Sequence, residues 1–232
     1  MGVSKVNDWF VWSDAGTIRI GHGPDWTSDT ARSAGTALVM VNGILLNNAS
    51  ITNGPAASRG TYVGTTRSAA DAALYWLYGS AVALGGASLL AVWNCYNRVN
   101  VGSTTSDTTD SWTYATNTWR AANNSTTNMR AQYVVGLAED SVSAVYCAIA
   151  SHSSAGVAAA GVGVNSTTAF SGTTAYNAAA TALAVSAAYS GVPGIGFNFI
   201  SALENASGAT STFYGDIGTA YIQSGLHVQL RM

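Results

Sequence analysis

Residues 141–203 read SVSAVYCAIASHSSAGVAAAGVGVNSTTAFSGTTAYNAAATALAVSAAYSGVPGIGFNFISAL and contain no Asp, Glu, Lys or Arg. Such charged side chains usually make up about a quarter of a soluble protein, but they make up 9% of this chain. An uncharged stretch must lie in lipid, pack against other protein, or be solvated by Ser, Thr, Asn and backbone groups. Gly and polar residues interrupt this stretch every few positions, which argues against lipid.

The pattern of the chain predicts β-strands rather than helices. Short segments with β-branched, aromatic or alternating apolar residues recur between Gly, Asn and Ser turns. Residues 9–12 and 17–20 are typical of a hairpin, and Asn42-Gly43 suits a type I′ turn between two more strands. Residues 178–188 are rich enough in Ala for a helix. The alternation through Leu183–Val185 favours a strand there.

The spacing of these strands predicts an all-β fold in two parts. The Ser/Thr-rich segment GSTTSDTTD, residues 102–110, indicates a linker. It divides the chain into a smaller β-rich module, residues 1–105, and an antiparallel, jelly-roll-like β-sandwich, residues 106–232. A Gly/Ala-rich connection occupies about residues 73–90 of the first module. Small residues fill the later strands, so their faces are expected to pack closely.

One segment has the length and aromatic ends of a membrane span, residues 73–96. Gly79-Ser80 and Gly85-Gly86 interrupt it, and no Lys/Arg asymmetry flanks it. These features favour a strand, a Gly-rich loop and a second strand, so no membrane span is predicted. The N-terminal residues lack the apolar region of a secretory signal.

Charge and cysteine content exclude several classes of partner. The net charge of −2 provides no basic field for nucleic acid. Cys95 and Cys147 lie far apart and fit no metal-ligand spacing, which favours buried free thiols in a reducing cytoplasm over a bridge. No cofactor motif is present, and the three histidines form no metal motif. Asp107 and Asp110 have two interpretations, a Ca²⁺ site or a solvated linker, of which the linker explains them better.

Carboxylates and aromatic residues are the remaining candidates for a site. A glycosidase needs two carboxylates that face a sugar, for which Asp25 with Asp29 or Glu139 with Asp140 are candidates. Neither pair is favoured, so no catalytic residue is assigned and the chain is not expected to be an enzyme. Three tryptophans are candidate contacts for a glycan or a partner protein, and the alternative is that they belong to the core: Trp26, Trp112 and Trp119. Arg120 is expected to stack on a nearby Trp or Tyr.

Several strings in a fixed order resemble one family. VWNCYNRV at residues 92–99, TDSWTYATNTWRAANN at 109–124 and VVGLAEDSVSA at 134–144 are similar to virion proteins of tailed bacteriophages and prophages. The same family is resembled by GVPGIGFNFISALE at 191–204 and STFYGDIGTAYIQSGL at 211–226. The strings DWFVWSDAGTIRI at 8–20 and RGTYVGTTR at 59–67 also resemble this family. The resemblance therefore covers most of the chain.

The resemblance implies a structural protein of the virion, homotrimeric, on the head or tail surface. Its expected partners are further copies of itself and the major capsid protein or another virion protein. Two roles follow: a decoration or cement protein of the head, or a receptor-binding domain of a tail fibre or tail tip that recognises host-surface glycans. Because interface cores are depleted in charge, residues 141–203 are predicted to supply most of the contact between subunits.

Overall fold

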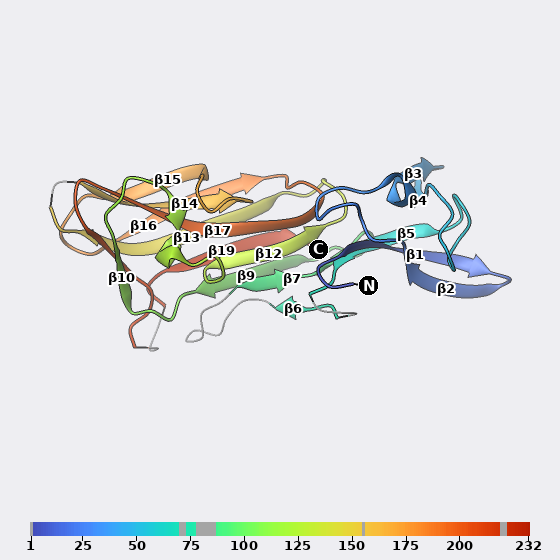
Figure 1. The fold of residues 1–232 in the computed structure, drawn as a ribbon, viewed down its shortest axis with the longest axis horizontal. Helices are drawn as coiled ribbons and strands as arrows, with labels where there is room; N and C mark the ends of the chain where they lie inside the picture. The colour runs from blue at the N-terminus through green and yellow to red at the C-terminus, as the bar shows by residue number, and fades with distance from the viewer. Residues whose placement is uncertain (1, 70–72, 78–86, 155, 219–221) are drawn as a thin grey trace.

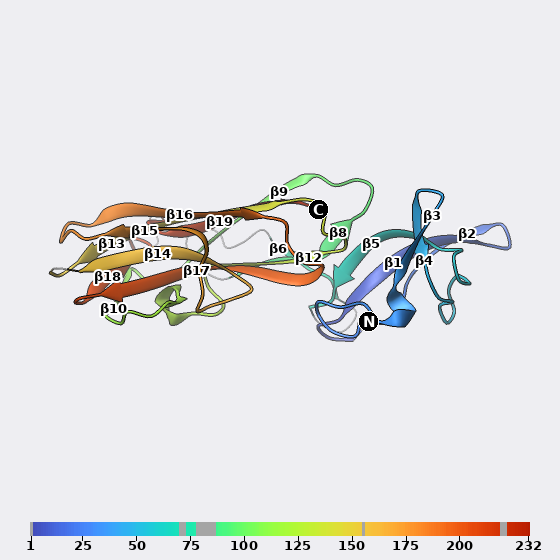
Figure 2. The same cartoon turned by 90° about the horizontal axis from the view of Figure 1, so that it is seen from above.

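The computed structural model describes residues 2–69, 73–77, 87–154, 156–218 and 222–232. Strands make up 56% of the structure and helices 3%, which confirms the predicted all-β class. Figures 1 and 2 show an elongated molecule with a smaller sheet at one end and two stacked sheets at the other. Within the described ranges, no helix has the length and hydropathy of a membrane span.

The N-terminal sheet contains both predicted hairpins. Its six strands are β1 (Val6–Asp14), β2 (Thr17–His22), β3 (Leu38–Val41), β4 (Ile44–Asn47), β5 (Thr61–Arg67) and β8 (Val92–Asn94), and a 3-10 helix, η1 (Ala34–Thr36), precedes β3. The hairpins turn at Ala15-Gly16 and Asn42-Gly43, where all four residues have positive φ, as a type I′ turn requires. The path through the sheet is β2-β1-β5-β4-β3, with β8 also paired to β5.

The two larger sheets form the β-sandwich. One comprises β9 (Asn100–Ser106), β10 (Ser111–Tyr114), β13 (Val142–His152), β16 (Leu183–Gly191), β18 (Ser211–Tyr214) and β19 (Gly225–Arg231). The other comprises β6 (Trp76–Leu77), β7 (Ser88–Leu90), β11 (Arg120–Ala121), β12 (Arg130–Val135), β14 (Val157–Val164), β15 (Ser171–Asn177) and β17 (Gly196–Ser207). A 3-10 helix, η2 (Ala122–Asn124), follows β11. The described ladders are antiparallel except the pairing of β7 with β12, so the predicted antiparallel sandwich is confirmed.

The uncharged stretch supplies the centre of this sandwich. It contains β13, β14, β15, β16 and most of β17, and the inward positions of β13 alternate with partly or fully exposed ones. Ala144, Ala148 and Ala150 are buried beside larger side chains such as Tyr146 and Ile200. Burial of each large apolar side chain contributes about 1.5–3 kcal/mol to folding. The small residues let the two sheets pack closely, and burial on the inner faces accounts for part of the missing charge.

The linker predicted at residues 102–110 is wrong over most of its length. Residues 100–106 form β9, which pairs with β19 along its whole length. Val101, Ser103 and Thr105 point inward and are buried, while the residues between them face outward. A regular alternation with β-branched Thr suits a pleated strand, although the hydroxyl-rich composition is that of a solvated loop. β9 runs across the predicted boundary between residues 105 and 106, so the sandwich begins before it.

Residues 90–101 are divided among several short elements. The end of β7, the whole of β8 and the start of β9 fall within this range, and β8 belongs to the N-terminal sheet. Of the Gly/Ala-rich connection at about residues 73–90, the part at 78–86 lies outside the described residues. This region therefore passes between the two parts of the molecule rather than forming one continuous strand.

Arg32 joins the N-terminal sheet to the sandwich. Its guanidinium binds both carboxylate oxygens of Asp8, at 2.7 and 3.0 Å, and donates a third hydrogen bond to the carbonyl oxygen of Gly136 at 3.0 Å. The same guanidinium lies 4.4 Å from the centre of the Trp26 ring. Asp8 also accepts a hydrogen bond from the Thr65 hydroxyl at 2.7 Å. Because Gly136 follows β12, these contacts connect β1 and β5 to the sandwich.

Arg67 makes a second connection at the same junction. Its guanidinium lies 3.9 Å from the centre of the Phe197 ring on β17 and pairs with Asp29 at 3.0 Å. The backbone N–H of Phe197 donates to the carbonyl oxygen of Asp29 at 2.7 Å. Gly196, with φ of 85°, permits this approach, because a Cβ there would lie 2.1 Å from the Asp29 carbonyl oxygen. The two parts are therefore held by side-chain and backbone contacts together.

We expect Arg32→Ala to lower the free energy of unfolding by about 3–5 kcal/mol, because it leaves the buried Asp8 carboxylate without its cation. Urea unfolding followed by tryptophan fluorescence measures this loss. The matched control is Arg19→Ala, which removes an exposed partner of Asp14 and should cost at most about 1 kcal/mol. Equal losses in the two variants would contradict the importance of the Arg32 contacts.

Candidate functional site

The three predicted tryptophans lie in separate environments. Trp26 is 4% exposed beneath Arg32, and Trp112 is 8% exposed against Phe213, with the ring centroids 6.3 Å apart. Trp119 is half-buried, and its ring packs against Phe170 at a centroid distance of 5.2 Å. The faces of Trp26 and Trp112 are thus covered by protein. A role for any of the three in glycan or partner binding stays a prediction, and Trp119 is the one with accessible surface.

Glu204 organises the segment that contains Trp112 and Arg120. The Glu204 side chain is fully buried on β17, and the Trp112 indole donates to its Oε2 at 2.6 Å. Arg120 Nε donates to Oε1 at 2.7 Å. The Arg120 guanidinium also lies 3.8 Å from the centre of the Tyr114 ring, which confirms the expected stacking contact. Glu204 on β17 therefore links β10 of one sheet of the sandwich to β11 of the other.

Burial has the largest effect on the pKa of the Glu204 carboxyl. Desolvation raises the pKa of its carboxyl above the usual 4.5, although hydrogen bonds from Trp112 and Arg120 oppose this shift. Burial likewise raises the pKa of Tyr146 well above its usual value, and the nearby Glu204 carboxylate adds to the effect. Because Glu204 has no exposed surface, its role in this structure is to hold two hydrogen-bond donors in place, the Trp112 indole and the Arg120 guanidinium.

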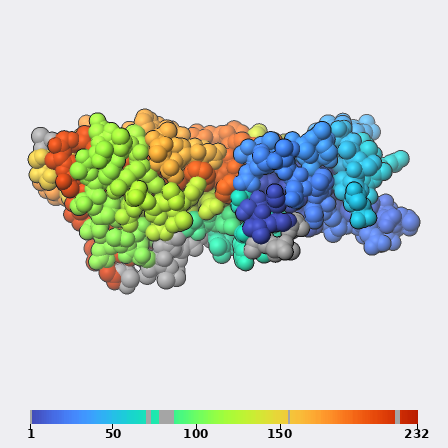
Figure 3. Space-filling view, in the orientation of Figure 1, coloured from blue at the N-terminus to red at the C-terminus, as the bar shows by residue number. Residues whose placement is uncertain are grey.

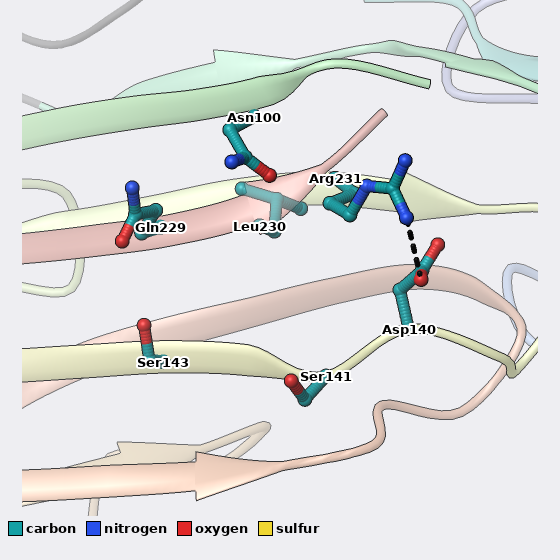
Figure 4. Close-up of a pocket in the computed structure, with 7 residues that line it drawn as sticks. All are labelled: Asn100, Asp140, Ser141, Ser143, Gln229, Leu230 and Arg231. Carbon is teal, nitrogen blue, oxygen red and sulfur yellow. Dashed lines mark ion pairs between the residues drawn. The ribbon is translucent and has the colours of Figure 1, made fainter. Parts of the chain in front are cut away.

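A polar pocket lies on the outer face of the sandwich (Figure 4). Its volume is about 210 Å³, and it is lined by Asn100, Asp140, Ser141, Ser143, Gln229, Leu230 and Arg231. Arg231 approaches Asp140 at 3.5 Å, while Arg98 pairs with both Asp140 and Glu139. The carboxylates at one end of the pocket are therefore neutralised by arginines. The rest of the lining consists of Leu230 and of amide and hydroxyl side chains on and beside neighbouring strands.

The other sequence candidates for chemistry are also engaged in the fold. Asp25 accepts a hydrogen bond from the Asn7 side chain at 2.8 Å, and Asp29 pairs with Arg67. Asp107 is buried, and although burial alone would raise its pKa, hydrogen bonds from Asn128 and Thr109 hold it below the usual range.

Asp110 accepts a hydrogen bond from the backbone N–H of Gly218 at 3.0 Å. Within the described part of the chain, no three His, Cys, Asp or Glu side chains group as metal ligands. Asp107 and Asp110 therefore gain no support as a Ca²⁺ site. Cys95 and Cys147 are free thiols, but the expectation that both are buried is wrong, because Cys147 is exposed and Cys95 is only half-buried.

An apolar pocket on the N-terminal sheet was not anticipated. It has a volume of about 190 Å³ and is lined by residues of four strands: Trp9, Ile20, Val63, Gly64, Thr65, Thr66, Val92, Trp93 and Asn94. Ile18 and Ile20, on the edge strand β2, remain 73% and 65% exposed. The sequence did contain a signal for this pocket. Pairing in the hairpin places Trp9, Val11, Ile18 and Ile20 on one face of the sheet.

The hairpin of β3 and β4 carries a second exposed apolar group. Met40, Val41 and Ile44 surround its Asn-Gly turn and are exposed, with Met40 at 60%. No charged residue occurs between Arg32 and Arg59. The N-terminal sheet thus presents apolar side chains to solvent at two places.

Comparison with known proteins adds no assignment. No protein-family model matches the chain, and no curated protein matches it significantly. The resemblance to phage virion proteins accordingly stays a prediction from the quoted strings.

We expect Glu204→Gln to flatten the pH dependence of stability above pH 4.5. Because the folded-state pKa of Glu204 is raised, its contribution is fully present below 4.5 and is lost as pH rises through the folded pKa. Asp107 acts in the opposite sense, since its lowered pKa contributes stability that is lost as pH falls through the folded value. Urea unfolding between pH 4 and 8 measures the slope. Glu139→Gln, at a half-exposed side chain, is the control for the removal of one carboxylate.

Proposed function

We propose that this chain is a non-enzymatic structural protein of a tailed-bacteriophage virion, which decorates or cements the head surface as a homotrimer. It would bind further copies of itself and the major capsid protein or another virion protein, after assembly in the bacterial cytoplasm. The support is the ordered set of strings that resemble such proteins, together with the low content of charge. An interface core depleted in charge matches that composition.

The observation that carries the proposal is the apolar surface of the N-terminal sheet. Apolar residues gathered on a protein surface mark sites of protein–protein contact more often than chance exposure does. Here they occupy β2 and the β3–β4 hairpin, and a further run of exposed apolar residues, Leu74 to Leu77, lies at and before the strand β6 of the sandwich. The carboxylates that were candidates for catalysis instead make structural contacts. An assembly role uses these features better than a catalytic role does.

A receptor-binding role at the tail is the second candidate. The observation that favours it is the Trp119 and Phe170 pair, because Phe170 is 48% exposed and Trp119 retains accessible surface. Adjacent aromatic rings at a surface suit stacking on sugars. The polar pocket of Figure 4 has hydroxyl and amide groups that suit hydrogen bonding to a hydroxyl-rich ligand.

We expect the purified protein to have about three times the 23.7 kDa mass of one chain by light scattering. It should also bind phage heads that lack it and sediment with them, because binding to the head would cover apolar side chains that are exposed in the free protein. Tails from the same virion are the control and should not retain it. A clean monomer that fails to bind heads would refute the proposal, and binding to tails alone would favour the second candidate.

We expect Trp119→Ala to leave head binding intact. Its cost in stability should fall below the roughly 3–5 kcal/mol of a fully buried tryptophan, because the side chain is only half-buried. Thermal unfolding and head sedimentation measure the two effects, with Phe170→Ala as the matched variant. Loss of adsorption to host cells in both variants, with an unchanged fold, would instead support glycan recognition.

A further inference from the structure

The β3–β4 hairpin ends in an apolar tip formed by Met40, Val41 and Ile44. Pairing places Val41 opposite Ile44 and Met40 opposite Leu45, so exposed apolar side chains lie on both faces of the tip. The two-residue turn at Asn42-Gly43 keeps the tip narrow. The hairpin joins the rest of its sheet through a single residue pair, and it projects as a separate arm in Figure 1. A narrow apolar arm of this kind is suited to insertion rather than to covering a flat surface.

The apolar pocket lies on the same sheet and has complementary chemistry. Trp9 and Val92 line it and Ile20 on β2 lies at its exposed side, whereas the Trp93 side chain is buried against Tyr62. The pocket lining contains no charged side chain, and neither does the tip. Contact between the tip and the pocket would therefore remove no charged group from water. It would avoid the desolvation penalty of a buried charge. Arg19 carries the one charge on β2 and is paired with Asp14.

The position of the two features favours contact between copies. In the sheet order β3 lies at one end and β2 at the other, so both edge strands are open. β2 has no Pro or bulge to protect its edge, and its one charged side chain, Arg19, is paired with Asp14. In Figure 3 the lighter blue and cyan residues of the N-terminal part form the right-hand end of the molecule, away from the bulk of the sandwich. One chain thus carries both an apolar projection and an apolar recess, on different edges.

We propose that the apolar tip of one subunit inserts into the apolar pocket of a second copy of this chain. Each subunit then uses its tip on one neighbour and its pocket on the other. Such head-to-tail contacts form a ring only when the rotation between neighbours closes, as the proposed homotrimer requires. The inference rests on the proposed homotrimer and specifies the contact that assembles it. It places this contact in the N-terminal sheet, whereas the sequence pattern placed most of the contact in residues 141–203.

The first test is the mass of single variants. Met40→Asp on the tip and Ile20→Lys at the pocket should each reduce the assembly from three chains to one in light scattering. Both positions are more than half exposed, so the fold should tolerate them, and circular dichroism with thermal unfolding verifies this. Leu183→Lys, an exposed position in the uncharged stretch, is the control and should remain trimeric. If Leu183→Lys dissociates the trimer while the other two variants keep it, the inference is overturned.

The second test uses the fact that each contact joins the tip of one chain to the pocket of another. Met40→Asp retains a complete pocket, and Ile20→Lys retains a complete tip, so an equimolar mixture should form a complex of two chains. A mixture that stays monomeric overturns the inference. So does a single variant that remains trimeric, and Ile44→Asp replaces Met40→Asp if that variant fails to fold.

Head binding separates the two proposals. A wild-type trimer that binds heads, but whose mass is unchanged by Met40→Asp and Ile20→Lys, refutes the tip-and-pocket contact and leaves the proposed function standing. A wild-type trimer that dissociates in both variants, but never binds heads, supports the contact and refutes the head-surface role. A wild-type monomer refutes the contact and the proposed homotrimer together.

Discussion

The buried cation of Arg32 is the interaction on which the arrangement of the molecule depends. It neutralises Asp8 inside the N-terminal sheet and reaches the backbone carbonyl of Gly136 at the end of β12. A charged group removed from water is tolerated only when it is paired and fully hydrogen-bonded. The geometry of these contacts therefore constrains how the N-terminal sheet sits on the sandwich. Arg67, stacked on Phe197, reinforces the same orientation.

This joint places the two parts around one continuous core. The sandwich is stabilised by small inward-facing residues, and Glu204 links β10 of one sheet to β11 of the other through two hydrogen bonds. The N-terminal sheet contributes Phe10 and Tyr62 to the same buried cluster but leaves apolar residues of β2 and the β3–β4 hairpin in solvent. The joint therefore buries part of the N-terminal sheet, while apolar side chains elsewhere on that sheet stay exposed.

Much of the fold was predictable from local patterns. The hairpins around Ala15-Gly16 and Asn42-Gly43 follow from turn residues that tolerate positive φ, and β16 follows from alternation that outweighs its alanine content. β9 was missed because its inward positions carry Ser and Thr, whose composition resembles that of a loop. The candidate site was less predictable. Tryptophan is typical of binding surfaces, yet long-range contacts with Arg32 and Glu204 bury Trp26 and Trp112.

The sequence alone determined the all-β class, the two hairpins and the lack of charge between residues 141 and 203, because strand alternation and turn chemistry are properties of neighbouring residues. The tertiary structure alone decided which aromatic residues are buried, and which acidic residues are paired. It also brought Trp9, Ile20 and Trp93 together around one apolar pocket, from strands far apart in the chain. The physical reason is that burial and pairing depend on contacts across sheets, which no local pattern encodes.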